Sequence, residues 1–214
     1  MDITAIITTA LSVFSAIMVA WFGYNQTAHN REVEAKIEEN KKRADEERER
    51  EVIRRDRESS RRRRNSAVVY GEIGELRTEF DACRVYIAQP HPMGDIEKIS
   101  IYYEVKRKGV EDMRKHIQQL PLADIPTFCK RLSEEDWMHY TALCEVRDEV
   151  AGSLMHVAGT KQLFVVRLLD INDDWCGSLF LEFTRKAKPN IQLLKKHMEE
   201  AAKNIHLILP EYKE

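Results

Sequence analysis

The chain has 214 residues, 33% of them charged, and a formal net charge of −2 at pH 7. Residues 31–64 hold 14 Lys or Arg and 11 Asp or Glu, whereas residues 65–214 hold 20 basic and 24 acidic residues. A nucleic-acid-binding domain usually carries an excess of basic residues, which the larger part of this chain lacks. The composition argues against nucleic acid as a partner, and the length fits one domain with attachments.

An apolar run without any charged side chain occupies residues 3–24. As a helix it would be roughly 33 Å long at about 1.5 Å per residue, close to the hydrocarbon thickness of a bilayer. It ends in Trp21, Phe22 and Tyr24, which suits an aromatic belt at a membrane interface. A cleavable signal peptide is the alternative, but it needs a basic n-region and a shorter apolar core. The sequence therefore predicts a transmembrane anchor at residues 1–24 that meets the lipid bilayer through residues 3–24.

The orientation of this anchor follows from the basic residues beside it. None precedes the run, while Arg31, Lys36 and Lys41 follow it. The positive-inside rule then predicts a single-pass membrane protein with its N-terminus outside and its C-terminal domain in the cytoplasm. Small side chains recur every four residues along the run, and such a stripe either pairs two chains or reflects the abundance of small residues in membrane helices. The stripe consists of Thr4, Thr8, Ser12, Ala16 and Ala20.

A charged helical stalk is expected at residues 25–66. No Pro or Gly occurs between Asn25 and Asn65, and acid-before-base pairs spaced i, i+4 each add a few tenths of a kcal/mol to a helix. These pairs are Glu32–Lys36, Glu38–Lys42, Glu39–Arg43, Glu46–Arg50, Glu51–Arg55 and Glu58–Arg62. Apolar residues are too few to sustain a coiled coil over three heptads within the stalk itself. A heptad-like seam follows at Val69, Ile73, Leu76 and Phe80, and it either pairs two chains or docks on the domain, the interpretation that we favour.

Residues 67–214 have the pattern of an α+β domain with an antiparallel sheet and packed helices. The expected strands are residues 83–88, 99–105, 162–169 and 175–184. A turn is expected at residues 89–94, which contain two prolines and a glycine. The expected helices are residues 111–119, 128–132, one that starts at the acidic segment 133–136, residues 150–157, and an amphipathic helix after Pro189. An extended connector is expected from Pro121 to Pro126.

This order of elements resembles the GAF fold, a small ligand-sensing fold related to PAS, over roughly residues 67–209. The resemblance rests on an entry helix, the strand and turn at residues 84–94, the strand at residues 99–105, and the hairpin of residues 162–169 and 175–183 with Gly177 and an acidic turn. One group of bacterial and phage GAF-like proteins has a His-Asn-Gly turn, of which His91 and Gly94 are the matching residues here. The cysteine and histidine that bind bilins or haem in some members have no match, so no cofactor is expected.

Candidate site residues are few. His91, Tyr102, Tyr140, His156 and Trp175 are the residues that we expect to line a ligand pocket between sheet and helices, although such side chains more often belong to a core or its rim. No motif of a catalytic or phosphate-binding loop occurs, so no catalytic residue and no enzyme activity is expected. The cysteines Cys83, Cys129, Cys144 and Cys176 form no CxxC pair, which predicts free thiols in a reducing compartment and no metal site.

Two functions fit this pattern. The first is a membrane-anchored cytoplasmic sensor or regulatory adaptor that acts through association with a protein partner or with itself. The alternative is a structural membrane tether or assembly factor, possible in a phage or bacterial setting, whose domain docks a partner protein without a small ligand. An enclosed polar pocket would favour the first, and a cavity filled by apolar side chains would favour the second.

Overall fold

A computed structural model describes residues 3–209, with side chains given for residues 36–206, 208 and 209 and for a few residues before 36. It divides into two compact units, residues 1–59 and residues 60–214, so the predicted stalk boundary at residue 66 falls inside the second unit. The helix α1 has the bounds Ile3–Glu79.

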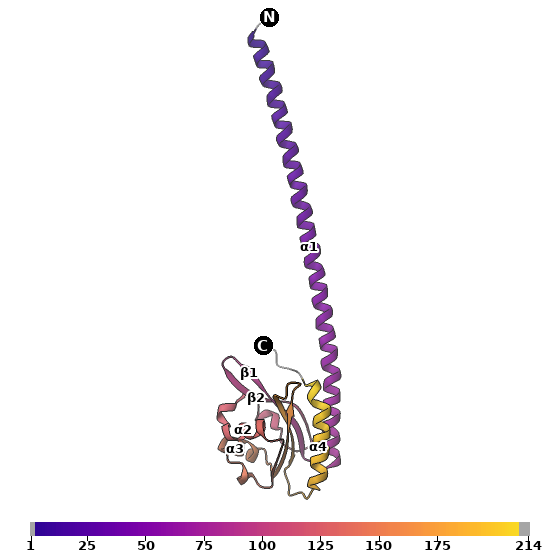
Figure 1. Ribbon diagram of the computed structural model, residues 1–214, viewed down its shortest axis with the longest axis vertical. Coiled ribbons are helices and arrows are strands. Elements are labelled where there is room, and N and C mark those ends of the chain that lie inside the picture. The colour runs from indigo at the N-terminus through magenta and orange to yellow at the C-terminus, as the bar shows by residue number, and fades with distance from the viewer. Residues whose placement is uncertain (1–2, 210–214) are drawn as a thin grey trace. The chain divides into compact units, whose positions relative to one another are not determined.

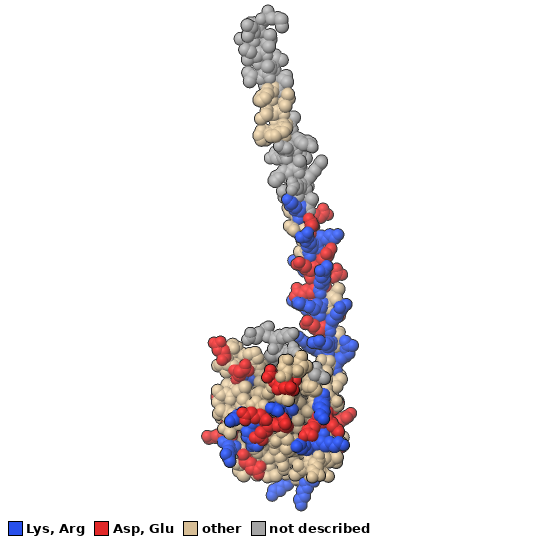
Figure 2. Space-filling view, viewed as in Figure 1, with Lys and Arg blue, Asp and Glu red and all other residues tan. Residues whose placement is uncertain are grey.

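The first unit consists of helix α1 residues whose described side chains are exposed. Lys and Arg are interspersed with Asp and Glu along its residues 36–59 (Figure 2). Among the side chains that the structure describes, two of the predicted i, i+4 pairs are ion pairs, Arg43 with Glu39 at 2.7 Å and Arg55 with Glu51 at 2.6 Å between side-chain nitrogen and oxygen. Because these side chains are mostly exposed, each pair adds less than about 1 kcal/mol to the helix.

The predicted membrane span is not supported by the structure. Within the part of the chain that the structure describes, no helix is long and apolar enough to cross a membrane. Between residues 3 and 24, side chains are described only at residues 14, 15, 17–19, 21 and 22, so most side chains of the predicted span lie outside the described ones. The small-residue stripe from Thr4 to Ala20 lies outside them as well.

The second unit contains one six-stranded antiparallel sheet in the order β3-β2-β1-β6-β5-β4 (Figure 1). Its strands are β1 (Arg84–Met93), β2 (Ile96–Lys106), β3 (Leu120–Pro121), β4 (Trp137–Tyr140), β5 (Gln162–Leu169) and β6 (Trp175–Phe183). Its further helices are α2 (Pro126–Glu134), α3 (Glu149–Val157) and α4 (Ile191–Ile205). Among the described residues, the 3₁₀ helices η1 (Met113–Lys115), η2 (Leu122–Asp124) and η3 (Leu143–Glu145) lie between these elements, and η4 (His206–Ile208) follows α4.

The two faces of the sheet are covered by different helices (Figure 1). We call the face under α1 and α4 the helix face, and its core contains Val69, Ile73 and Leu76 of α1 together with Leu194 and Met198 of α4. All five side chains are at most 3% exposed. The heptad-like seam of α1 therefore docks on its own domain, which confirms the favoured interpretation.

The opposite face, which we call the cleft face, is covered by α2 and α3. Its separate core includes Tyr86 and Phe180 from the sheet and Phe128, Leu132 and Met155 from the two helices. The hairpin of β5 and β6 also follows the prediction, since β5 has the expected bounds and β6 ends one residue early. The amphipathic helix after Pro189 is α4, capped by the Asn190 side chain, which accepts a hydrogen bond from the Leu193 N–H.

The expected turn at residues 89–94 was wrong. Strand β1 continues to Met93 and pairs with β2 throughout, with Pro90 opposite Ile99 and Pro92 opposite Glu97. Strand β6 pairs with β1 only as far as Ala88. Since the prolines lie where β1 has one neighbouring strand instead of two, the N–H groups that they lack are not needed by the sheet.

Three other local predictions differ from the structure. The helix expected at residues 111–119 is reduced to the 3₁₀ turn η1, and the acidic segment 133–136 ends α2 and leads into β4 instead of starting a helix. Strands β3 and β4 were missed; β3 and η2 occupy the expected connector. Both strands are at the edges of the sheet and short, and a strand of two to four residues gives too little alternation to be read from sequence.

Candidate functional site

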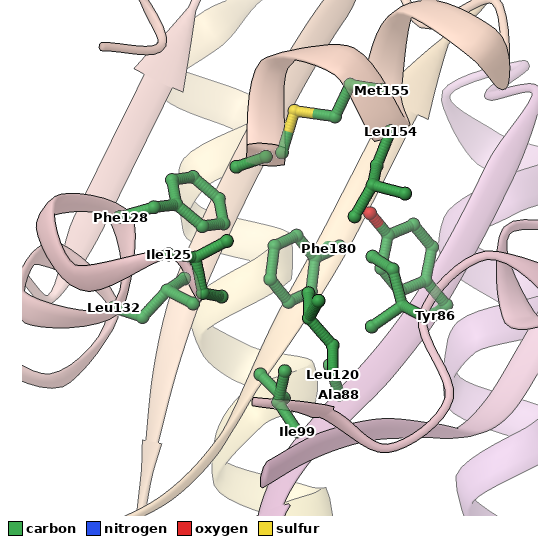
Figure 3. A pocket seen from close by; sticks show the side chains of 12 residues that line it. Tyr86, Ala88, Ile99, Leu120, Ile125, Phe128, Leu132, Leu154, Met155 and Phe180 are labelled. Atoms are coloured by element: carbon green, nitrogen blue, oxygen red, sulfur yellow. The ribbon is translucent and has the colours of Figure 1, made fainter. Parts of the chain in front are cut away.

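An apolar cavity lies between the cleft face of the sheet and helices α2 and α3 (Figure 3). Twelve side chains line it, among them Tyr86, Phe128, Met155 and Phe180, and Tyr86 and Phe180 stack with ring centroids 4.7 Å apart. Its volume is about 20 Å³, which is room for roughly one water molecule. The side chains in this interior thus occupy the space that a small ligand would need.

One wall of this cavity belongs to a buried polar network centred on Arg84. Its Nε donates to Glu182 Oε2 at 2.9 Å, and its Nη1 donates to the carbonyl oxygens of Glu111 at 2.8 Å and Ala158 at 3.0 Å. Its Nη2 donates to Thr160 Oγ1 at 2.8 Å and also to Glu182 Oε2. The five N–H groups of the guanidinium therefore all have acceptors.

The carboxylate of Glu182 is the acceptor at the centre of this network. It also accepts from the Tyr86 hydroxyl at 2.5 Å and from the Thr160 hydroxyl at 2.8 Å. Burial, followed by the nearby Glu182 carboxylate, raises the pKa of Tyr86 well above its usual value. Burial alone would lower the pKa of Arg84, but Glu182, Tyr86 and Glu104 together outweigh it and the pKa is raised.

The role of the network is structural, because Arg84 and Glu182 are both 0% exposed and face each other across β1 and β6. It ties these strands to the loop at Glu111 and to the end of α3 at Ala158. No local pattern in the sequence predicts this network. The sequence does contain a hint of it, because β1 and β6 each contain one charged residue, Arg84 and Glu182, in a mostly apolar strand.

An open polar cleft of about 360 Å³ lies beside α2 on the same face, and we call it the α2–η3 cleft. It is lined by Thr127, Phe128, Arg131, Tyr140, Glu145, Arg147 and Asp148. Its volume is in the range of small-molecule sites. Arg131 donates to Tyr140 Oη at 2.6 Å and pairs with Glu135 at 2.6 Å, and Glu135 in turn raises the pKa of Arg131. The α2–η3 cleft therefore combines an open volume with charged side chains that could bind a ligand.

The acidic groups of this cleft already accept hydrogen bonds from the backbone. Asp148 Oδ2 accepts from the Phe128 N–H at 2.7 Å and so satisfies the first turn of α2. Glu145 accepts from the Thr141 hydroxyl at 2.5 Å and the Thr141 N–H at 3.0 Å, and these bonds lower the pKa of Glu145. The carboxylates of Asp148 and Glu145 therefore stabilise the two segments that form the cleft, the first turn of α2 and the backbone at Thr141.

The structure places the five predicted site residues in several environments and not in one pocket. Tyr140 is buried and lines the α2–η3 cleft. His91 and Tyr102 come from β1 and β2, where the rings are 6.3 Å apart and Tyr102 packs against the core of the helix face. His91 Nε2 is 2.8 Å from Ser100 Oγ.

The remaining two predicted residues also lie apart from each other. Trp175 is partly buried against the core of the cleft face, and its Nε1 donates to Ser178 Oγ at 3.1 Å. His156 is exposed on α3. The residues that the prediction missed, Arg131, Arg147 and Asp148, lie in segments where sequence alone does not show which charges share a cleft.

The cysteines are free, as predicted, and differ in their accessibility. Cys144 is exposed, Cys83 is buried, and Cys129 and Cys176 are partly buried. Burial raises the pKa of the Cys176 thiol to about 11 and also raises that of Cys129. Among the side chains that the structure describes, no group of three or more His, Cys, Asp or Glu is arranged to hold a metal ion.

A carboxyl group with an unusual pKa lies at the other edge of the sheet. Glu104 of β2 accepts hydrogen bonds from the N–H groups of Met113 at 2.9 Å and Arg114 at 3.0 Å. Burial, and then a hydrogen bond with Asp112, raises the pKa of Glu104 to about 7. This carboxyl group thus holds the start of η1, and its pKa lies near neutral pH.

Comparison with known proteins identifies similar structures but no close relative. No protein-family model matches the chain, and no curated protein matches it. The GAF domain of PixJ from Thermosynechococcus elongatus, in its blue-light absorbing form, matches with a TM-score of 0.52 and 13% identity, over 69% of this chain and 88% of that one. A GAF domain/HD domain protein from Geobacter sulfurreducens matches with a TM-score of 0.50 and 11% identity, over 66% of this chain and 91% of that one.

A second type of match includes a domain with a bound chromophore. The phycocyanobilin-bound GAF domain of a cyanobacterial phytochrome matches with a TM-score of 0.50 and 15% identity, over 69% of this chain and 91% of that chain. Similarity at such low identity concerns the path of the backbone and the order of the elements. It carries no information on which ligand, if any, is bound.

Proposed function

We propose that this chain, whose α+β unit has a GAF-like fold, is a membrane-anchored sensor or regulatory adaptor that acts through protein association. The α2–η3 cleft is the observation that carries the sensory part of the proposal, since it combines an open volume of about 360 Å³ with two arginines and two carboxylates. The charge-free run of residues 3–24 supports the anchor, and the basic residues after it support a cytoplasmic domain.

A second candidate is the structural tether or assembly factor. The apolar cavity favours it, because about 20 Å³ leaves no room for a ligand larger than a water molecule inside the domain. In this alternative the domain docks a protein partner and responds to no small molecule. The two candidates therefore differ in whether the α2–η3 cleft is occupied during function.

Membrane topology is tested with the cysteine that the fold leaves in solvent. Cys144 is exposed, so a membrane-impermeant maleimide should label it only after the membrane of intact cells or spheroplasts is permeabilised. A Cys144→Ser variant is the control for the slower thiols Cys129 and Cys176. Labelling before permeabilisation, or release of the chain from membranes by alkaline carbonate, would contradict the anchored cytoplasmic arrangement.

Association is tested on the full chain in the same membranes. Crosslinking with a short amine-reactive reagent should give discrete products, either one dominant partner or a defined self-association product. A chain that remains monomeric under these conditions would contradict action through association. An association that persists unchanged whatever small molecules are supplied would favour the tether over the sensor.

A further inference from the structure

The α2–η3 cleft contains a cation whose hydrogen-bonding capacity is unused. Arg147 is exposed, and within the described part of the chain no hydrogen bond or ion pair of its guanidinium is found. The other cation, Arg131, already donates to Glu135 and Tyr140. A guanidinium presents several N–H donors in one plane and matches the two oxygens of a carboxylate. Arg147 is therefore the group in this cleft that is available to an anion.

The cleft also contains acceptors for a cation. Asp148 is 8% exposed, and one of its oxygens accepts from the Phe128 N–H, while Glu145 accepts two bonds from Thr141. An ionised carboxylate has about four lone-pair positions, so both groups keep acceptor capacity toward the cleft. The bonds from Thr141 favour the ionised form of Glu145 at neutral pH. The lining thus offers negative charge next to the positive charge of Arg147.

The charged side chains that line the cleft indicate which class of ligand fits it. Two arginines and two carboxylates line the cleft, and Arg131 is already paired with Glu135 beside it. A phosphate or another simple anion would meet the two carboxylates, and a simple cation would meet the two arginines. A molecule that carries both charges avoids each of these repulsions.

The apolar part of the lining indicates the body of such a molecule. Phe128 and Tyr140 are 5% and 2% exposed, with ring centroids 6.3 Å apart. They belong to α2 and β4, whose positions are fixed by packing in the core of the cleft face. Aromatic side chains on rigid elements with a few polar groups beside them are typical of small-molecule sites.

We infer that the α2–η3 cleft binds a small zwitterion of the α-amino acid class, with its carboxylate at Arg147, its ammonium group at Glu145 and Asp148, and its side chain at Phe128 and Tyr140. This inference rests on the proposed sensory function, for which it names the class of ligand.

The test uses three probes that share a phenyl body and differ in charge. The purified full chain in mild detergent is titrated with L-phenylalanine, with L-phenylalaninamide, which lacks the carboxylate, and with 3-phenylpropanoate, which lacks the ammonium group. Isothermal titration calorimetry or saturation-transfer NMR measures the binding. We expect L-phenylalanine to bind at least about tenfold more tightly than either of the other two, because each loses one charge-assisted contact.

Variants then assign the binding to the cleft. Arg147→Gln and Glu145→Gln should each weaken the binding of L-phenylalanine about tenfold or more, while Glu145→Gln keeps an oxygen that can accept from Thr141. Arg114→Gln is the matched control, since Arg114 is exposed on the loop beside the opposite edge of the sheet and should leave binding unchanged. Circular dichroism checks that each variant is folded.

Three results would overturn the inference. They are binding of 3-phenylpropanoate as tightly as L-phenylalanine, no measurable binding of any probe to the folded wild-type chain, and binding that Arg147→Gln leaves unchanged. These results are independent of the topology and crosslinking experiments. A failure of the ligand class is therefore distinguishable from a failure of the anchored, associating protein.

Discussion

The two faces of the sheet differ in how they are built. The helix face is covered by two long helices whose buried side chains, such as Ile73 and Met198, are apolar and regularly spaced. The cleft face is covered by the nine-residue helices α2 and α3 and by irregular loops, and it contains the network of Arg84 and the charged α2–η3 cleft. Long regular elements therefore support the sheet, while short elements joined by loops place the polar groups of the α2–η3 cleft.

The largest expected effect comes from the buried network of the cleft face. Replacing Arg84 by Met leaves the Glu182 carboxylate buried without its cation, and this should lower the free energy of unfolding by about 3–5 kcal/mol. The free energy of unfolding is measured by urea denaturation that is monitored by circular dichroism. Arg55→Met is the control, because its ion pair with Glu51 is exposed and its loss should change stability by less than about 1 kcal/mol. Equal effects in the two variants would contradict a structural role for the network.

A smaller effect is expected from pH at Glu104. The folded state raises the pKa of this carboxyl group from its usual 4.5 to about 7, so the folded state binds the proton more tightly than the unfolded state. The free energy of unfolding should therefore fall as the pH rises from about 4.5 to 7. Asp112, whose pKa is lowered first by its hydrogen bond with Glu104, acts in the opposite direction and only at lower pH.

The measurement for Glu104 is the urea midpoint as a function of pH. Glu104→Gln keeps an acceptor oxygen for one of the two N–H groups, those of Met113 and Arg114, and cannot ionise. The variant should thus lack the decline between pH 4.5 and 7. If the stability of the wild-type chain instead rises steadily between pH 4.5 and 7, the fold does not raise the pKa of Glu104.

The smallest effect concerns two glycines on α1 in the second unit. A Cβ atom added at Gly71 or Gly74 would meet nothing within 4 Å. Each change to Ala should therefore stabilise the fold by about 0.5–1 kcal/mol, because glycine in a helix interior has a larger entropic cost of folding. Thermal unfolding measures the shift.

A third glycine provides the contrast for this prediction. A Cβ atom at Gly177 of β6 would lie 2.9 Å from the carbonyl oxygen of Ala88, so Gly177→Ala should destabilise the sheet. Opposite signs for the two kinds of glycine are the expected outcome. Destabilisation by Gly71→Ala would indicate that this position is packed against something other than the described residues.

The sequence predicted the helix face better than the cleft face, for physical reasons. The spacing of Val69, Ile73 and Leu76 and the long hairpin of β5 and β6 are local patterns, and each can be read from one segment. The network of Arg84 and Glu182 joins residues that are 98 positions apart. The α2–η3 cleft likewise depends on how a loop folds back on α2. Neither depends on local periodicity, so neither could be derived from one segment of the sequence.

The central claim is that recognition occurs on the cleft face and support on the helix face. Hydrogen–deuterium exchange of the full chain with and without saturating L-phenylalanine tests it most directly. We expect slower exchange in residues 126–148, which include α2, β4 and η3, and unchanged exchange in α4 and in residues 69–79 of α1. Protection confined to the helix face, or no difference anywhere in the chain, would contradict it.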